Sequence, residues 1–171
     1  ADSPNFITPS QFGEITGWIS GIEFAAEFKN TSSKEILATL ENYPGISWVE
    51  SERLESLLGL KEEALNLIYK LPIENLDGLD EIADKIKNQP LTFHLTSKEE
   101  TLSADHFKII QSLSSLGKVI LGFGISAENV TELSENANIS GLALDSGDEI
   151  KPGLRDFDLL ADILEALEIE D

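Results

Sequence analysis

Residue types that often carry chemistry are absent or scarce in this chain. Its 171 residues include no cysteine, no methionine and only two histidines, His94 and His106. Without cysteine the chain forms no disulfide, offers no thiolate nucleophile and binds no metal through sulfur. No residue pattern indicates a cofactor, and none is expected. Because the chain contains no methionine and opens on Ala1, we expect the sequence to begin inside a longer gene product.

Basic residues are scarce as well. Lysine and arginine number 12 against 32 acidic residues, which gives a formal net charge of −20. Such a chain repels nucleic acid and anionic membranes, so neither is expected as a partner. No apolar run is long enough to span a bilayer, and no positive and apolar leader opens the chain. These features favour a cytoplasmic protein with a solvated acidic surface, in which backbone N–H groups would have to hold any phosphate ligand.

Strand-like and helix-like patterns alternate along the chain and predict a helix over 8–19 followed by six strand–helix units. The predicted strands span 21–28, 46–50, 64–71, 91–96, 118–123 and 139–144, and the predicted helices span 32–43, 52–59, 76–89, 103–116, 126–137 and 155–170. Such alternation is typical of a parallel sheet in an α/β fold. Two closures stay open at this point: a flavodoxin-like open sheet, or a (β/α)₈ barrel with two further units ahead of Ala1.

Capping residues mark the starts of several predicted helices. Thr8, Ser32 and Ser103 each stand directly before an amphipathic run, where a side-chain oxygen can accept from a free helix amide. Ser126 and Asn129 form a weaker pattern of the capping-box type. The residues expected to point inward from the last predicted helix are Phe157, Leu160, Ile163, Leu164 and Leu167.

The stretch 121–130, LGFGISAENV, joins the end of a predicted strand to the start of a predicted helix. Gly122 and Gly124 lie where the strand ends, and Ser126 precedes the helix. A strand, a glycine turn and a helix N-terminus form a common cradle for phosphate and other anions. The stretch is therefore a candidate anion site.

Three stretches carry a resemblance through their order and the element types on which they lie: 3–15 (SPNFITPSQFGEI), 121–130 and 144–164 (LDSGDEIKPGLRDFDLLADIL). In these stretches the chain resembles the phosphoribosylanthranilate isomerase family, tryptophan-biosynthesis enzymes with a TIM-barrel fold. Its members carry Ser-Pro-Arg-Tyr-Ile-Ser/Thr-Pro after the second strand. Near their end they carry a Gly-Gly-Leu-x-Pro-Glu-Asn-Val turn and an Asp-x-Ser-Ser-Gly-Val-Glu loop.

The resemblance implies an α/β fold, the TIM (β/α)₈ barrel, of which the chain covers about strands 3 to 8. Residues 1–171 would then form a single barrel domain that is incomplete at its N-terminus. A barrel that lacks two strands exposes two sheet edges, so about 40–50 further residues are expected ahead of Ala1. The expected assembly is a monomer or a homodimer.

The resemblance also implies a reaction, the Amadori rearrangement of a phosphorylated aminoaldose. A general acid opens the sugar ring and a general base removes the proton at C2, both at the carboxyl ends of strands. The family's acid, an aspartate on strand six, aligns with His94, and imidazolium can also donate a proton near neutral pH. Its base, a cysteine on strand one, would precede Ala1. Asn5 aligns with the arginine that helps to hold the anthranilate carboxylate, and it leaves at most a neutral hydrogen bond.

The family holds the substrate phosphate on backbone N–H groups of its last two strand–helix turns. Gly124, Ser146 and Gly147 match family positions in those turns, and Gly122 would shift the first turn by one residue. Asp145 replaces a serine. Its carboxylate beside a phosphate is repulsive by roughly 1–4 kcal/mol per charge pair at 4 Å.

Three hypotheses stay open. The first is an isomerase that acts on a small phosphorylated, sugar-like ligand. The second is a non-catalytic or repurposed barrel with a binding or regulatory role, favoured by the substitutions, and in it His94 is only a polar side chain in the barrel mouth. The third is a metal site made of Asp145, Asp148 and Glu149, but their spacing matches no calcium loop, and no metal is expected.

Overall fold

The computed structural model describes residues 6–76, 79–86, 91–147, 149–151 and 154–168. Its backbone forms two compact units, Ala1–Tyr69 and Lys70–Asp171. Six parallel strands follow one another in the sheet in chain order, β1-β2-β3-β4-β5-β6. This order lacks the reversal that defines both open doubly wound sheets, so the flavodoxin-like alternative is excluded. The prediction of one domain over 1–171 stays a prediction.

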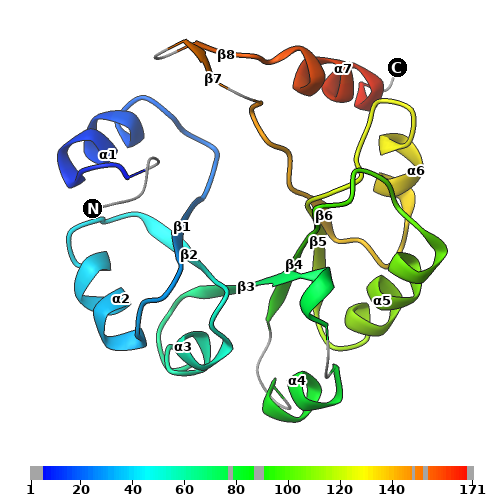
Figure 1. Cartoon of the computed structure of the whole chain (residues 1–171). Helices are drawn as coiled ribbons and strands as arrows, with labels where there is room; N and C mark the ends of the chain where they lie inside the picture. The colour runs from blue at the N-terminus through cyan, green and yellow to red at the C-terminus, as the bar shows by residue number, and fades with distance from the viewer. Residues whose placement is uncertain (1–5, 77–78, 87–90, 148, 152–153, 169–171) are drawn as a thin grey trace. The chain divides into compact units, whose positions relative to one another are not determined.

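The first unit alternates helices and parallel strands (Figure 1). Its elements are α1 (Pro9–Thr16), β1 (Phe24–Phe28), α2 (Ser33–Leu40), β2 (Ile46–Ser51), α3 (Leu54–Leu58) and the first part of β3 (Asn66–Pro72). β2 pairs in parallel with β1 on one side and β3 on the other. Ile36 of α2, Val49 of β2 and Leu57 of α3 are fully buried, so these side chains form the core of this unit.

The second unit contains the remainder of β3 and the rest of the chain. Its elements are η1 (Ile73–Asn75), α4 (Leu79–Ile86), β4 (Thr92–Thr96), α5 (Ala104–Ser114), β5 (Lys118–Leu121), α6 (Val130–Glu135), β6 (Gly141–Leu142), β7 (Glu149–Lys151), β8 (Leu154–Arg155) and α7 (Asp158–Leu167). β5 pairs in parallel with β4 and with β6, whereas β7 and β8 form an antiparallel hairpin.

Alternation along the strands separates the core of the second unit from the candidate site. Successive strand residues point to opposite faces. Phe93 and Leu95 of β4, like Val119 and Leu121 of β5, are fully buried, and α5 packs against β5. The intervening His94 points to the opposite face of the sheet and is only half-buried.

The predicted order of a leading helix and six strand–helix units is confirmed. Three predicted N-caps are also confirmed, because the side chains of Thr8, Ser32 and Ser103 accept from the amides of Gln11, Glu35 and His106. None of the helices in the described ranges has the length and apolar composition that a bilayer-spanning helix requires.

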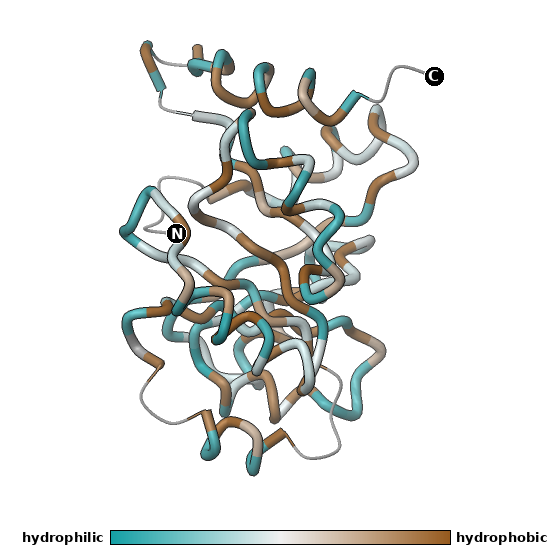
Figure 2. Tube along the Cα trace, turned by 90° about the vertical axis from the view of Figure 1, so that its right-hand side faces the viewer, coloured by the Kyte–Doolittle hydropathy of each residue, from teal (hydrophilic) through white to brown (hydrophobic). Residues whose placement is uncertain are grey.

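Three local predictions were wrong. The helix expected to begin at 126 begins at Val130, because the turn before it has its own hydrogen bonds. The β7–β8 hairpin lies where no strand was predicted. In α7 only part of the expected inward face is covered. Ile163 is buried, whereas Phe157 and Leu164 are about half exposed, and Figure 2 shows hydrophobic and hydrophilic residues alternating along this last helix.

We expect Ile110→Ala to lower the free energy of unfolding by about 2–5 kcal/mol, because it leaves a cavity under α5. Ile110 is fully buried, whereas Phe107, one turn earlier on the same helix, is 36% exposed. Phe107→Ala is the matched control and should cost clearly less. Urea unfolding of both variants measures the difference, and equal losses would contradict the assigned inner face.

Candidate functional site

The carboxyl ends of β4, β5 and β6 lie side by side. Leu95 is in register with Leu121, and Leu121 is in register with Leu142. The Gly122 amide donates to the carbonyl of Leu95 at 2.9 Å, and the Ala143 amide donates to the carbonyl of Leu121 at 2.8 Å. The segments that follow β5 and β6 therefore leave from neighbouring strands. We call the turn 122–126, the loop 145–147 and His94 the candidate ligand site.

His94 lies directly against the start of the turn. A β-carbon built on Gly122 would collide with Nε2 of the His94 ring and would lie 3.0 Å from its Cδ2. The imidazole occupies the space that a side chain at this position would fill, so any larger residue has to displace the His94 ring. The structure thus brings together two residues that were predicted to belong to the site, His94 and Gly122.

The turn after β5 is shaped by Gly124 and Asn129. Gly124 has φ +66°, a conformation that favours glycine. The Asn129 side chain donates to the Gly124 carbonyl at 2.8 Å and accepts from the Ser126 amide at 2.9 Å. Asn129 thereby closes a turn, which is why α6 begins only at Val130. Within the described part of the chain, the amides of Gly124 and Ile125 donate no hydrogen bond.

A carboxylate stands next to this turn. The Ser126 hydroxyl donates to Glu128, and this hydrogen bond lowers the pKa of the Glu128 carboxyl below its ordinary value. Glu128 is therefore ionised at neutral pH. Its charge opposes binding of an anion near Ser126, so the amides of Gly124 and Ile125 are the better donors.

The loop after β6 is held by an acceptor within it, Asp145, and by a cation from β8, Arg155. The Asp145 carboxylate accepts from the Gly147 amide at 3.0 Å. Arg155 of β8 donates through Nη1 to the Ser146 hydroxyl oxygen at 2.9 Å and to the Gly147 carbonyl at 3.2 Å. Because Oγ of Ser146 accepts from Arg155, the hydroxyl hydrogen can be donated to a ligand.

Sequence reasoning missed Arg155. The signal available in the sequence was a basic residue, scarce in this chain, in the segment that follows the Ser146-Gly147 pair. Nothing local shows that this segment folds back as the β7–β8 hairpin and places the guanidinium on the loop.

Two predicted positions lie outside the described residues: Asn5, and Asp148 of the hypothetical metal set. In the described ranges no group of three or more histidine, aspartate or glutamate side chains is placed to hold a metal ion.

No family model and no curated protein matches this chain. The solved structures that it resembles are mainly phosphoribosylanthranilate isomerases. The Thermus thermophilus enzyme matches with a TM-score of 0.69 and 21% identity, over 97% of this chain and 82% of its own. The Thermotoga maritima enzyme matches with a TM-score of 0.70 and 18% identity, over 96% and 82%.

A third phosphoribosylanthranilate isomerase was solved in complex with reduced 1-(o-carboxyphenylamino)-1-deoxyribulose 5-phosphate. It matches with a TM-score of 0.69 and 16% identity, over 96% of this chain and 81% of its own. At such identities the likeness establishes the fold, which is TIM-like, as the sequence resemblance implied. The correspondence to barrel strands 3 to 8 stays a prediction.

We expect Gly122→Ala to displace the His94 ring and to destabilise the chain by about 1–3 kcal/mol, the usual cost of overpacking. Gly141→Ala is the matched control, because a β-carbon there meets only an Ile120 side-chain atom at 3.8 Å. The chain has two histidines, so imidazole NMR signals report the change directly. An unshifted His94 signal in Gly122→Ala would show that the ring does not lie on the turn.

Proposed function

We propose that this chain binds a small phosphorylated, sugar-like molecule at the candidate ligand site and acts on it as an aldose–ketose isomerase. The fold alone does not assign this activity. The observation that carries the proposal is the contact between His94 and Gly122. An imidazole then lies beside a turn in which the Gly124 and Ile125 amides donate to no acceptor among the described residues, and we infer that these amides bind the anion.

Phosphate binding would use donors from both segments of the site. The Gly124 and Ile125 amides supply two from the turn after β5. The Ser146 hydroxyl and the remaining N–H groups of Arg155 supply more from the loop after β6. Charge-assisted hydrogen bonds of this kind are about twice as strong as neutral ones.

In the isomerisation His94 would act as the general acid. As imidazolium it donates a proton to the ring oxygen, the C1–O bond breaks, and the sugar opens. A general base then takes the proton from C2, which gives an enaminol, and return of a proton to C1 as the C2 carbonyl forms gives the aminoketose. The neighbour solved with a reduced deoxyribulose phosphate supports a ligand of this class. The expected setting is the cytoplasm, as a monomer or homodimer.

One observation favours a second function, a non-catalytic barrel that binds a different ligand or none. The Asp145 carboxylate accepts from the Gly147 amide. A phosphate bound in this loop would have to accept from the same amide. A carboxylate at this position both competes with and repels a phosphate. Under this alternative the chain keeps the fold without the reaction.

We expect Asp145→Asn to tighten binding of inorganic phosphate by about fivefold, because one negative charge near the ligand is removed. Asparagine keeps an oxygen that can accept from Gly147, so the loop conformation is preserved. Phosphate-induced shifts of the Gly124 and Ile125 amides in ¹H–¹⁵N NMR spectra measure the dissociation constant. Asp162→Asn on the exposed side of α7 is the control for net charge. Absence of any phosphate effect in both the unsubstituted chain and Asp145→Asn would refute the proposed phosphate site.

We expect His94→Ala to reduce turnover of phosphoribosylanthranilate by about 10²–10⁴-fold in the full-length protein, the usual contribution of a general acid. Asp162→Asn, a substitution at an exposed residue of α7, is the control. Turnover that survives His94→Ala unchanged would remove His94 from the mechanism. Turnover absent from the unsubstituted protein would favour the non-catalytic alternative.

A further inference from the structure

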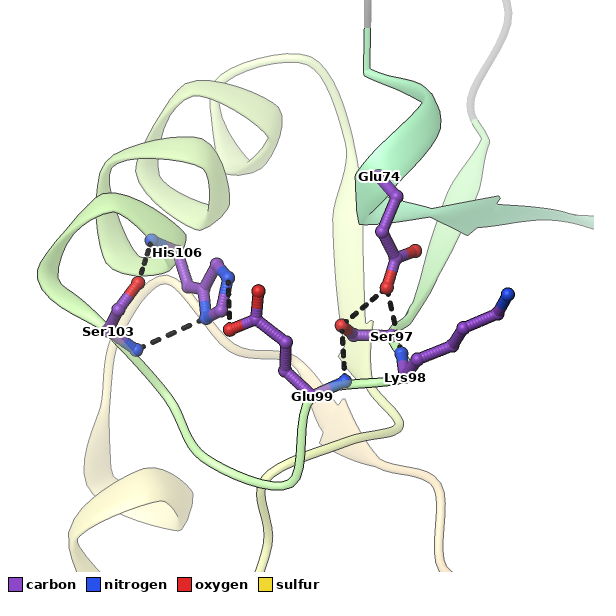
Figure 3. A network of polar contacts seen from close by, with 6 residues as sticks. All are labelled: Glu74, Ser97, Lys98, Glu99, Ser103 and His106. Carbon is purple, nitrogen blue, oxygen red and sulfur yellow. Dashed lines mark hydrogen bonds and ion pairs between the residues drawn. The ribbon is translucent and has the colours of Figure 1, made fainter.

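The 97–103 loop, which joins β4 to α5, is held at its start by Glu74. Glu74 lies in η1, directly after β3. Its carboxylate oxygen Oε1 accepts from the Ser97 hydroxyl and from the Lys98 amide, both at 2.8 Å. Ser97 Oγ in turn accepts from the Glu99 amide at 3.0 Å. Figure 3 shows the first two contacts meeting at the Glu74 carboxylate and the third joining the Glu99 amide to Ser97.

The end of the loop is held by His106. The Ser103 amide donates to His106 Nδ1 at 3.1 Å, and the His106 amide lies 3.4 Å from Ser103 Oγ. Nδ1 therefore acts as an acceptor and carries no proton. Nε2 faces Glu99 at 3.7 Å (Figure 3). The buried ring also packs edge to face on Phe123, with centroids 5.2 Å apart.

The loop between these two anchors packs on the candidate ligand site. A β-carbon built on Gly124 would lie 2.8 Å from Leu102 Cγ and 3.2 Å from the Leu102 amide nitrogen. Leu102 thus fills the space beside Gly124, while Phe123 contacts His106. The position of the Gly124 and Ile125 amides depends on a loop whose first residues are fixed by Glu74.

We propose that Glu74 is a positioning residue of the candidate ligand site: by fixing the start of the 97–103 loop, it keeps Leu102 on Gly124 and holds the turn 122–126 in its anion-binding form. Its link to ligand binding rests on the proposed function, whereas its link to the turn does not. Glu74 touches no residue of the turn in the described contacts, so its effect passes through the loop.

The chemistry of the contact supports this role. Hydrogen bonds from the Lys98 amide and the Ser97 hydroxyl lower the pKa of the Glu74 carboxyl. The carboxylate is consequently ionised at neutral pH, and both hydrogen bonds are charge-assisted. No other described residue accepts from the Lys98 amide, so Glu74→Ala leaves the start of the loop without its anchor.

The test compares Glu74→Ala and Glu74→Gln with Glu35→Ala in the full chain. Glu35 is a matched control because its carboxylate also accepts from one backbone amide and one serine hydroxyl, both of Ser32. It lies in the other compact unit, on α2. The readout is hydrogen exchange of the individual amides in 97–103 and 122–126.

We expect Glu74→Ala to speed exchange of the Ser126 amide, which donates to Asn129 within the turn, by about tenfold, as the loss of one to two hydrogen bonds implies. Glu74→Gln keeps an acceptor oxygen and should restore most of the protection, and Glu35→Ala should leave both segments unchanged. Faster exchange in 97–99 alone, or equal acceleration throughout the chain, would overturn the positioning role.

A phosphate titration separates this proposal from the proposed function. With inorganic phosphate as the probe, Glu74→Ala should weaken binding severalfold and Glu35→Ala should not. If phosphate shifts no amide of the unsubstituted chain, the proposed function fails while the exchange data still decide the role of Glu74. Normal phosphate binding in Glu74→Ala together with unchanged exchange in 122–126 would refute the positioning role outright.

Discussion

The parallel register of β4, β5 and β6 is the constraint on which the candidate ligand site depends. Backbone hydrogen bonds from Gly122 to Leu95 and from Ala143 to Leu121 fix the level at which the strands end. Because those ends coincide, residues separated by about fifty positions in the sequence meet at one edge of the sheet. A shift by one residue would turn His94 to the opposite face, against α5, and no side chain of the site would keep its place.

Electrostatics decide what this edge can bind. Backbone amides at Gly124 and Ile125 and the guanidinium of Arg155 favour an anion, whereas the carboxylates of Glu128 and Asp145 oppose one. The chain has a net charge of −20, so its wider field also disfavours anions. Binding of phosphate therefore rests on short-range hydrogen bonds. The proposed function and its non-catalytic alternative differ mainly in whether those bonds outweigh the two nearby carboxylates.

Acceptor side chains organise the loops that follow β4, β5 and β6. Glu74 accepts from the start of the 97–103 loop and His106 accepts from its end. Asn129 accepts from the turn after β5, and Asp145 accepts from the loop after β6. Each satisfies backbone donors that regular structure leaves unpaired. The loops at the strand ends are thus fixed by specific hydrogen bonds and by contacts such as Leu102 on Gly124, and substitutions at these acceptors would move the site without touching a ligand.

Local sequence patterns were enough to predict the alternation of elements and the caps at Thr8, Ser32 and Ser103, because apolar spacing and cap chemistry are local properties. It also marked Gly122, Gly124, His94 and the Ser146-Gly147 pair, and the resemblance implied the TIM-like fold. Local patterns did not predict three contacts of the folded chain: His94 lies on Gly122, Asn129 delays the start of α6, and Arg155 donates to Ser146. Those contacts join residues that local patterns cannot pair, since strand register and chain reversal fix them.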